Sequence, residues 1–381
     1  MRFSKVVTLL SDTGHKPYVL QNHRKGKKVL VAPSLVGRVM GTTLAGDRGE
    51  ILGWINVPAI EKGMVDPVFN NFGGEERFWF APEGGQFGLN LGGHVSGWQY
   101  YQVQDAFNTQ PFRVLKAETN LLTMSSRMKL INARRARFDF EVTRTVRILD
   151  DCPYTLGYDN KVDFVGFETV NISRHAAKTP VPRAHGALAM FCLTQFLAHP
   201  RLVIIVPFRP GSARLLGPPV RKDYWKDFCA HGALPRHRYH IDKCFALMKG
   251  DGKLRGKFGV GRRRAVPRLA SLDLDTNELI IVDCDFYPEL EYVGSYWRRM
   301  QNPYDGDALS VSYEGPDDAG RSGQSYELET LSPALLLQPG QALSHRNRIY
   351  HLFGPAAAIN QICRRYFGAD RAVIERFDAH F

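Results

Sequence analysis

Two glutamates near the C-terminal end of the sequence have the spacing of an acid–base pair. Glu327 and Glu329 alternate with apolar residues, so in a strand both side chains point to one face, about 7 Å apart. A later extended segment, 343–351, places His345, Asn347 and His351 on one of its faces. Carboxylates beside histidines suit general acid–base catalysis. The exposed face of an antiparallel sheet commonly carries the same residue types, so that interpretation stays open.

The turn between these two segments is also readable from the sequence. Residues 338–341 read Gln-Pro-Gly-Gln, and this proline followed by glycine predicts a hairpin that joins the two strands. A second turn, 303–306, has proline and glycine at its ends. Around it lie three further candidates for substrate binding, Tyr304, Asp305 and Asp307.

The segment 73–87 combines two glycine pairs, three consecutive aromatic residues and several polar groups. Trp79, Glu83 and Gln86 are candidates to bind a polyol, because they offer a flat ring, an acceptor and an amide. The neighbouring aromatic residues Phe78, Phe80 and Phe87 are expected in the core. A purely structural hairpin, whose glycines only close the turn, is the alternative.

Short strands and turns dominate the chain and indicate a mainly β protein. Four β-branched or aromatic runs predict strands at 28–32, 138–148, 202–208 and 279–283. In the second run Phe138, Phe140 and Val142 alternate with polar residues, as in a half-buried strand. Helix signals gather in a C-terminal tail, about 355–381, with proline at the first turn and Gly368 as the C-cap. We therefore expect residues 1–381 to form one large antiparallel β domain.

Composition and charge limit the classes of binding partner that the sequence suggests. The net charge of +12 leaves nucleic-acid or polyanion binding open as a minor alternative, centred on the arginines at 262–264. The basic runs do not lie in a long tail, so we expect neither nucleic acid nor a membrane as a partner. The N-terminal apolar run is too short for a signal peptide, and irregularly spaced cysteines indicate free thiols, so a cytoplasmic location is expected.

Cofactor signals are weak. Five residues have side chains suitable for zinc: Cys229, His231, His237, His240 and Cys244. Their spacing matches no recognisable zinc motif, so we expect no metal. The glycine-rich segment 256–261 lacks the glycine order of a dinucleotide turn and is read as a loop. No cofactor is expected.

Three segments resemble the galactose mutarotase-like (aldose 1-epimerase-like) superfamily, closest to an uncharacterised bacterial branch. They are Leu-Glu-Thr at 328–330, Leu-Gln-Pro-Gly at 337–340 and Ser-His-Arg-Asn-Arg-Ile-Tyr-His at 344–351. Val-Asn-Ile-Ser-Arg-His at 170–175 is similar to a further motif of that family. The Gln-, Pro-, Asp- and Asn-rich stretch that follows Leu-Glu-Thr in the family is absent, and so is a clear Asn-Arg substrate motif.

The resemblance implies a β-supersandwich with a sugar site on the concave face of one sheet. It implies that Glu329 is the base at the anomeric centre and that His175 is the acid. In an enzyme of this kind His345 is the alternative acid, and Glu327 would tune Glu329, since a nearby like charge raises one of the two pKa values. Trp79 or Trp98 would stack on the sugar ring. The expected function is carbohydrate binding, with epimerase or mutarotase activity as its catalytic form and a non-catalytic carbohydrate-binding protein as the alternative.

Overall fold

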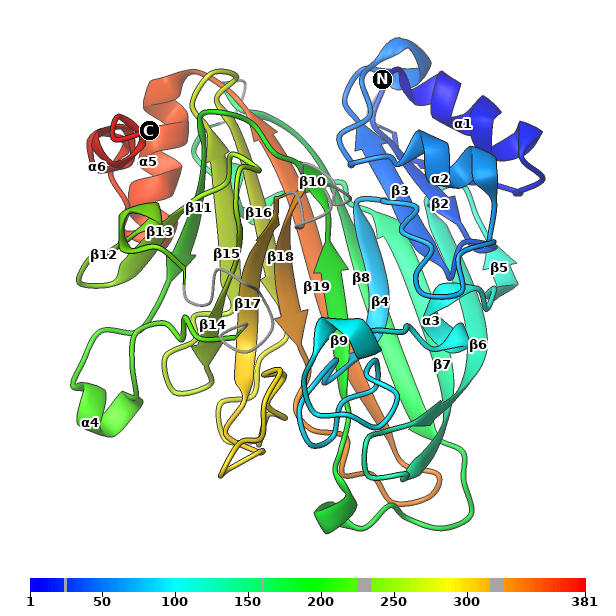
Figure 1. The fold of residues 1–381 in the computed structure, drawn as a ribbon. Coiled ribbons are helices and arrows are strands. Elements are labelled where there is room, and N and C mark those ends of the chain that lie inside the picture. The colour runs from blue at the N-terminus through cyan, green and yellow to red at the C-terminus, as the bar shows by residue number, and fades with distance from the viewer. Residues whose placement is uncertain (24–25, 159–160, 225–233, 316–324) are drawn as a thin grey trace.

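Two antiparallel sheets stacked face to face make up the body of the protein (Figure 1). The structure is a computed structural model that describes residues 1–23, 26–158, 161–224, 234–315 and 325–381. Within these residues the sheets have nine and ten strands, which confirms the mainly β class predicted from the sequence.

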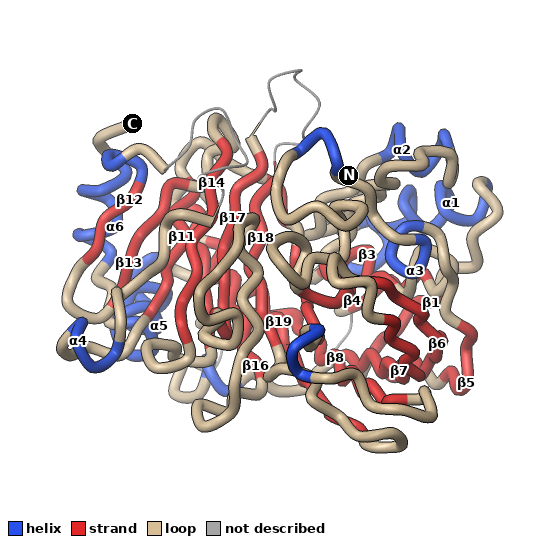
Figure 2. The backbone as a smooth tube through the Cα atoms, turned by 60° about the horizontal axis from the view of Figure 1, so that its bottom comes forward, coloured by secondary structure: helices blue, strands red, loops and turns tan. Residues whose placement is uncertain are grey.

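The nine-stranded sheet combines segments from both ends of the chain. Its strands, in spatial order, are β1 (Tyr18–Gln21), β2 (Lys28–Ala32), β3 (Arg38–Thr43), β4 (Glu76–Ala81), β9 (Ala189–Thr194), β18 (Ser325–Leu331), β17 (Asp307–Glu314) and β14 (Arg255–Gly261). The short strand β10 (Phe196–Leu197) also pairs with β18. Figure 2 shows β14, β17 and β18 side by side.

The ten-stranded sheet lies against one face of the first. Its order is β12 (Tyr239–Ile241), β13 (Phe245–Lys249), β11 (Leu202–Pro207), β15 (Arg268–Asp273), β16 (Glu278–Cys284), β19 (Ala342–Phe353), β8 (Asp163–His175), β7 (Arg137–Ile148), β6 (Leu121–Ile131) and β5 (Arg113–Ala117). In β7 the residues Phe138, Phe140 and Val142 are buried between the sheets, as their alternation predicted.

The turn at 338–341 connects the two sheets and does not close a hairpin. Gln341 N–H donates to Gln338 O at 3.0 Å and Gly340 has a φ of 83°, so the turn itself forms as predicted. However, β18 pairs with β17 and β9, whereas β19 pairs with β16 and β8 in the other sheet. The predicted pairing of β18 with β19 is therefore wrong, because a turn signal fixes a reversal of the chain and not the sheet that the next strand joins.

Helices cover the outward faces of the sheets at opposite ends of the molecule (Figures 1 and 2). On the nine-stranded sheet, α1 (Phe3–Asp12) and α2 (Val57–Lys62) bury Leu30 and Ala32 of β2. On the ten-stranded sheet, α5 (Ala356–Phe367) and α6 (Arg371–Asp378) bury Val203 and Ile205 of β11. The remaining short helices are α3 (Asp105–Asn108) and α4 (Ala213–Leu216).

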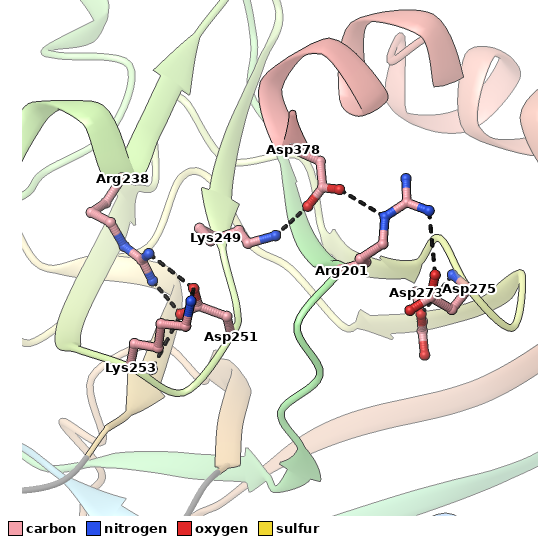
Figure 3. Close-up of polar contacts among 8 residues, drawn as sticks. All are labelled: Arg201, Arg238, Lys249, Asp251, Lys253, Asp273, Asp275 and Asp378. Carbon is pink, nitrogen blue, oxygen red and sulfur yellow. Dashed lines mark hydrogen bonds and ion pairs between the residues drawn. The ribbon is translucent and has the colours of Figure 1, made fainter. Parts of the chain in front are cut away.

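The C-terminal helices begin and end as their sequence signals indicate. Pro355 precedes α5, and Gly368 ends it in the left-handed conformation with a φ of 71°. At the end of α6, Asp378 accepts from Lys249 of β13 and from Arg201, whose Nε lies 3.0 Å from the carboxylate (Figure 3). These contacts fix α6 on the ten-stranded sheet. In the described part of the chain, no helix is both long and apolar enough to cross a membrane.

Candidate functional site

Glu329 lies on the outward face of the nine-stranded sheet. Its neighbour Thr330 points to the other sheet, because Thr330 Oγ1 contacts His345 Nε2 at 3.0 Å and Asn347 Oδ1 at 3.2 Å. Successive strand residues alternate between the faces, so Glu327 and Glu329 share the opposite, outward face. Both side chains are buried there, Glu327 with 4% and Glu329 with 0% exposure.

Strand register brings a row of polar residues to these glutamates. Ser310 lies opposite Glu329, and Ser312 lies opposite Glu327 and next to Lys257 of β14. On the other side of β18, Leu193 of β9 separates Glu329 from Arg77 of β4. Five strands distant in the sequence thus place one cation on each side of the glutamate pair.

Glu329 accepts hydrogen bonds from three side chains. Lys257 Nζ lies 2.9 Å from Oε1 and 2.8 Å from Oε2, and the hydroxyls of Ser310 and Ser312 also donate to the carboxylate. Burial by itself lowers the pKa of Lys257, but the neighbouring Glu329 and Glu83 outweigh it, so that the pKa of Lys257 is raised. Lys257 is therefore an ammonium in contact with a carboxylate.

Glu327 forms the second ion pair. Arg77 Nη2 lies 2.9 Å from its Oε1, and Ser312 donates to its Oε2 at 3.1 Å. Because Ser312 also contacts Glu329, the hydroxyl links the two ion pairs. The Arg77 guanidinium lies 4.8 Å from the ring centroid of Trp79.

Strand β14 corrects the prediction of a loop at 256–261. The glycines there are accommodated in a strand because they leave room for side chains from neighbouring segments. A Cβ on Gly259 would stand 2.2 Å from Asp307 Oδ2, so only glycine allows this approach. The absence of side chains at 256 and 259 was read as a loop signal, and Lys257 was missed for that reason.

A buried group around Asp307 forms a wall beside Lys257. Asp307 Oδ2 accepts from Tyr224 at 2.6 Å and from Tyr296 at 3.0 Å, and its Oδ1 lies 3.2 Å from Arg221. Burial raises the pKa of Asp307, which the arginine and the two hydroxyls partly offset. The Tyr224 ring centroid lies 5.4 Å from Lys257 Nζ, which joins this wall to the Glu329 pair.

Aromatic side chains line the rim of the same region. Trp98 stacks on Tyr101 with centroids 4.6 Å apart, and Tyr101 stacks on Trp297 at 5.6 Å. Trp297 packs with Tyr224 in one cluster, whereas Trp98 is 38% exposed. The segment 82–112, coloured cyan, carries Trp98 and Tyr101 and lies in front of β4 and β9 (Figure 1).

The chain matches one protein family over nearly its whole length. The model of DUF6786, a family of unknown function, matches residues 1–377. The chain belongs to this family. No curated protein has a sequence that matches it.

Solved structures with the same fold are remote in sequence. A galactose mutarotase-like protein from Lactobacillus casei has a TM-score of 0.52 at 12% identity, covering 88% of this chain and 100% of its own. A candidate aldose 1-epimerase from Escherichia coli K12 has a TM-score of 0.54 at 11% identity, covering 90% and 100%. An aldose epimerase homologue from C. elegans has a TM-score of 0.50 at 9% identity, covering 90% and 99%. The chain therefore has the galactose mutarotase-like fold predicted from its motifs.

The two histidines expected near Glu329 belong to the other sheet. His345 faces the space between the sheets, and burial lowers its pKa to about 4. His175, at the end of β8, lies beside Phe140, with ring centroids 5.9 Å apart, and burial lowers its pKa too. Their positions separate both from the outward face that carries Glu329, so the structure does not bring the expected acid to the expected base.

Two of the expected substrate-binding residues hold loops together. The amide of Gln86 makes two hydrogen bonds of 2.8 Å with the backbone of Met300. Tyr304 donates to Arg183 O at 2.7 Å and packs on Phe87, which is in the core as predicted.

The other candidates lie closer to the glutamates. Trp79 is on the outward face, but it is 1% exposed, and Phe69 and Phe107 pack on it. Asp305 pairs with Arg221 at 2.9 Å, beside Asp307. Glu83 acts electrostatically on Lys257.

The structure also shows where the arginines at 262–264 and the residues suited to zinc lie. Arg264 is buried and donates to the carbonyls of Arg209, Gly211 and Gly217, so part of the arginine cluster supports loops. Of the residues suited to zinc, Cys229 and His231 lie outside the described residues. No group of three metal-binding side chains occurs within the described ranges.

Proposed function

We propose that the outward face of β4, β9, β18, β17 and β14 binds a carbohydrate and catalyses the exchange of its anomers. The observation that carries this proposal is the contact between the Glu329 carboxylate and the Lys257 ammonium, 2.8 Å apart. A base and an acid side by side are what ring opening of an aldose requires. The stacked aromatic residues at the rim suit the apolar face of a sugar.

The proposed reaction uses Lys257 in place of a histidine. Glu329 takes the proton of the anomeric hydroxyl, the bond between the anomeric carbon and the ring oxygen breaks, and Lys257 gives its proton to that oxygen. Rotation about the bond between C1 and C2 of the open-chain aldehyde, followed by the reverse transfers, closes the ring in the other configuration. Both residues then have their starting protonation, and no cofactor is consumed. Arg77 and Glu327 would hold the sugar hydroxyls.

Anomer exchange of a panel of aldoses, followed by NMR, tests this function. The wild-type protein is expected to accelerate exchange of at least one sugar, and Glu329→Gln and Lys257→Met to reduce that rate by a factor on the order of 100 or more. Glu168→Gln, which removes a carboxylate paired with Arg348 on the far sheet, is the matched control. Exchange at the buffer rate for every sugar, with or without the wild-type protein, would refute catalysis.

A non-catalytic carbohydrate-binding protein is the second candidate, and one observation favours it. The Glu329 side chain is 0% exposed, and three donors already occupy its oxygens. A sugar hydroxyl would have to displace these donors before Glu329 could take its proton. Calorimetric binding of a sugar without acceleration of its anomer exchange, unchanged in Glu327→Gln and Glu329→Gln, would select this candidate.

A further inference from the structure

Two arginines lie side by side at the β3–β4 junction of the outward face. Val39 of β3 pairs with Glu76 of β4 in antiparallel register, so Arg38 and Arg77 come next to each other across the two strands. Glu76 points to the other sheet, where it pairs with Arg144, so Val39 opposite it faces the same way and both arginines lie on the opposite, outward face. Arg38 is 0% exposed and Arg77 is 7% exposed.

Much of their hydrogen-bonding capacity is unused. Among the described residues, none forms a hydrogen bond with Arg38 Nε and Nη2, Arg77 Nε and Nη1, or Trp79 Nε1. Arg38 Nη1 donates to Gly73 O, and Arg77 Nη2 to Glu327. Guanidinium and indole nitrogens only donate, so the atom that completes this group must be an acceptor.

Two other buried arginines, Arg144 and Arg264, are fully satisfied, and a third, Arg238, lacks a partner only at Nε. Arg144, 0% exposed, donates through Nε to Gly37 O at 2.9 Å and through its terminal nitrogens to Glu76 and Asn171. Arg264, 2% exposed, uses all three nitrogens on backbone carbonyls. Arg38 and Arg77 each leave two nitrogens without a partner, more than any other buried arginine of the described residues.

Charge at this position is also unbalanced. Burial lowers the pKa of Arg38, the positive charge of Arg77 lowers it further, and Glu327 partly opposes both effects. Two guanidinium groups thus share one nearby carboxylate. Buried like charges are costly unless an opposite charge joins them.

We propose that Arg38, Arg77 and the Trp79 indole bind an oxyanion carried by the ligand, a carboxylate or a phosphate, so that the substrate class is a sugar acid or a sugar phosphate. An oxyanion offers several acceptor oxygens and the missing negative charge, and arginine binds such planar or tetrahedral groups through paired donors. The assignment of a sugar rests on the proposed function, whereas the oxyanion site rests on the arginine pair alone.

The test compares matched ligands at constant ionic strength. Glucose, glucuronate and glucose 6-phosphate, the corresponding galactose series and inorganic phosphate are titrated by calorimetry into wild-type protein, Arg38→Met and Arg38→Lys. Arg127→Met is the control, because Arg127 is half exposed and pairs with Asp139 on the far sheet. At least one anionic sugar is expected to bind the wild type about tenfold or more tightly than its neutral parent.

Arg38→Met should abolish this preference, and Arg127→Met should retain it. Arg38→Lys, which keeps the charge with fewer donors, should fall between wild type and Arg38→Met. Without ligand, Arg38→Met is expected to raise the thermal unfolding midpoint, since it removes a buried charge that Arg77 repels. A lower midpoint together with equal affinity for neutral and anionic sugars would overturn the proposal.

The outcomes separate the oxyanion site from the sugar function. Binding of inorganic phosphate that is lost in Arg38→Met, with no sugar bound, keeps the oxyanion site and removes the carbohydrate function. Neutral sugars that bind as tightly as their anionic analogues, unaffected by Arg38→Met, remove the oxyanion site and keep the carbohydrate function. No binding of any anionic probe also overturns the oxyanion site. A preference for glucuronate or for the 6-phosphate identifies the oxyanion.

Discussion

Glu329 and Glu76 are fully buried carboxylates on opposite faces of the same sheet, and their partners come from different places. Glu76 is paired with Arg144 and lies near Thr169, both from the sheet stacked against it. Glu329 is bound by Lys257, Ser310 and Ser312, which belong to neighbouring strands of its own sheet. Between the sheets Glu76 is held by residues of the facing sheet, whereas the described partners of Glu329 lie in its own sheet. A buried ion pair therefore links the two sheets in one position and joins strands of a single sheet in the other.

The largest expected loss of stability comes from breaking the ion pair between Arg144 and Glu76, which lies between the sheets. Arg144→Met leaves Glu76 as an uncompensated buried charge and should lower the free energy of unfolding by about 3–5 kcal/mol. Lys257→Met should cost less, about 1–3 kcal/mol, because the two serine hydroxyls still donate to Glu329. Urea unfolding followed by circular dichroism measures both. Equal losses in the two variants would contradict the distinction between the faces.

The pH dependence of stability tests whether His345, buried between the sheets, stays unprotonated in the folded protein. Burial lowers the pKa of His345 to about 4, so between pH 6.5 and 4 the unfolded chain takes up a proton that the folded chain refuses. Stability due to His345 is therefore lost as the pH falls through this window, by about 3 kcal/mol. His345→Asn should flatten the acid limb of a plot of unfolding free energy against pH. An unchanged acid limb would mean that His345 takes up its proton at the same pH in the folded and the unfolded chain, which contradicts the lowered pKa.

On the same strand, the pKa of His351 is shifted in the opposite direction from that of His345. Although burial alone would lower it, Glu75 and Glu278 raise the pKa of His351 to about 10, and these carboxylates lie 2.8 Å and 2.6 Å from its ring nitrogens. Its stabilising contribution is complete below pH 6.5 and is lost as the pH rises toward 10. His351→Gln should remove that alkaline loss while keeping the acid limb. The same unfolding series measures both histidines, and a common direction for the two would be inconsistent with their environments.

Much of the fold, and one half of the site, could be predicted from the sequence. Alternation placed Glu327 and Glu329 on one face, and the proline and glycine around 355–368 located α5. Alternation gives parity along one strand, but it does not identify the sheet that a neighbour joins. For that reason His345 was expected beside Glu329 and lies behind it. Lys257 was missed because its flanking glycines serve close packing, which depends on distant residues such as Asp307.

A smaller effect is expected at the rim of the outward face. Trp98→Ala should weaken sugar binding by about tenfold, since an exposed ring stacked on Tyr101 offers its surface to the ligand, while stability changes by about 0.5 kcal/mol or less. Tyr100→Ala is the matched control, because this ring is 41% exposed but stacks on His94. Calorimetric titration compares the two. A larger loss in Tyr100→Ala would move the binding surface away from Trp98.

The smallest expected effect is that of Asp305→Asn, which is best measured against the same substitution at Asp307, the other aspartate that contacts Arg221. Asp305 is 32% exposed and pairs with Arg221 at 2.9 Å, so Asp305→Asn should cost about 1 kcal/mol or less. Asp307 is 0% exposed and also accepts from Tyr224 and Tyr296, so Asp307→Asn should cost about 2 kcal/mol or more. Thermal unfolding of the two variants gives the ranking directly. Because Asp307 supports the wall beside Lys257 and Asp305 only extends it, the reverse ranking would mean that the wall depends on its exposed edge.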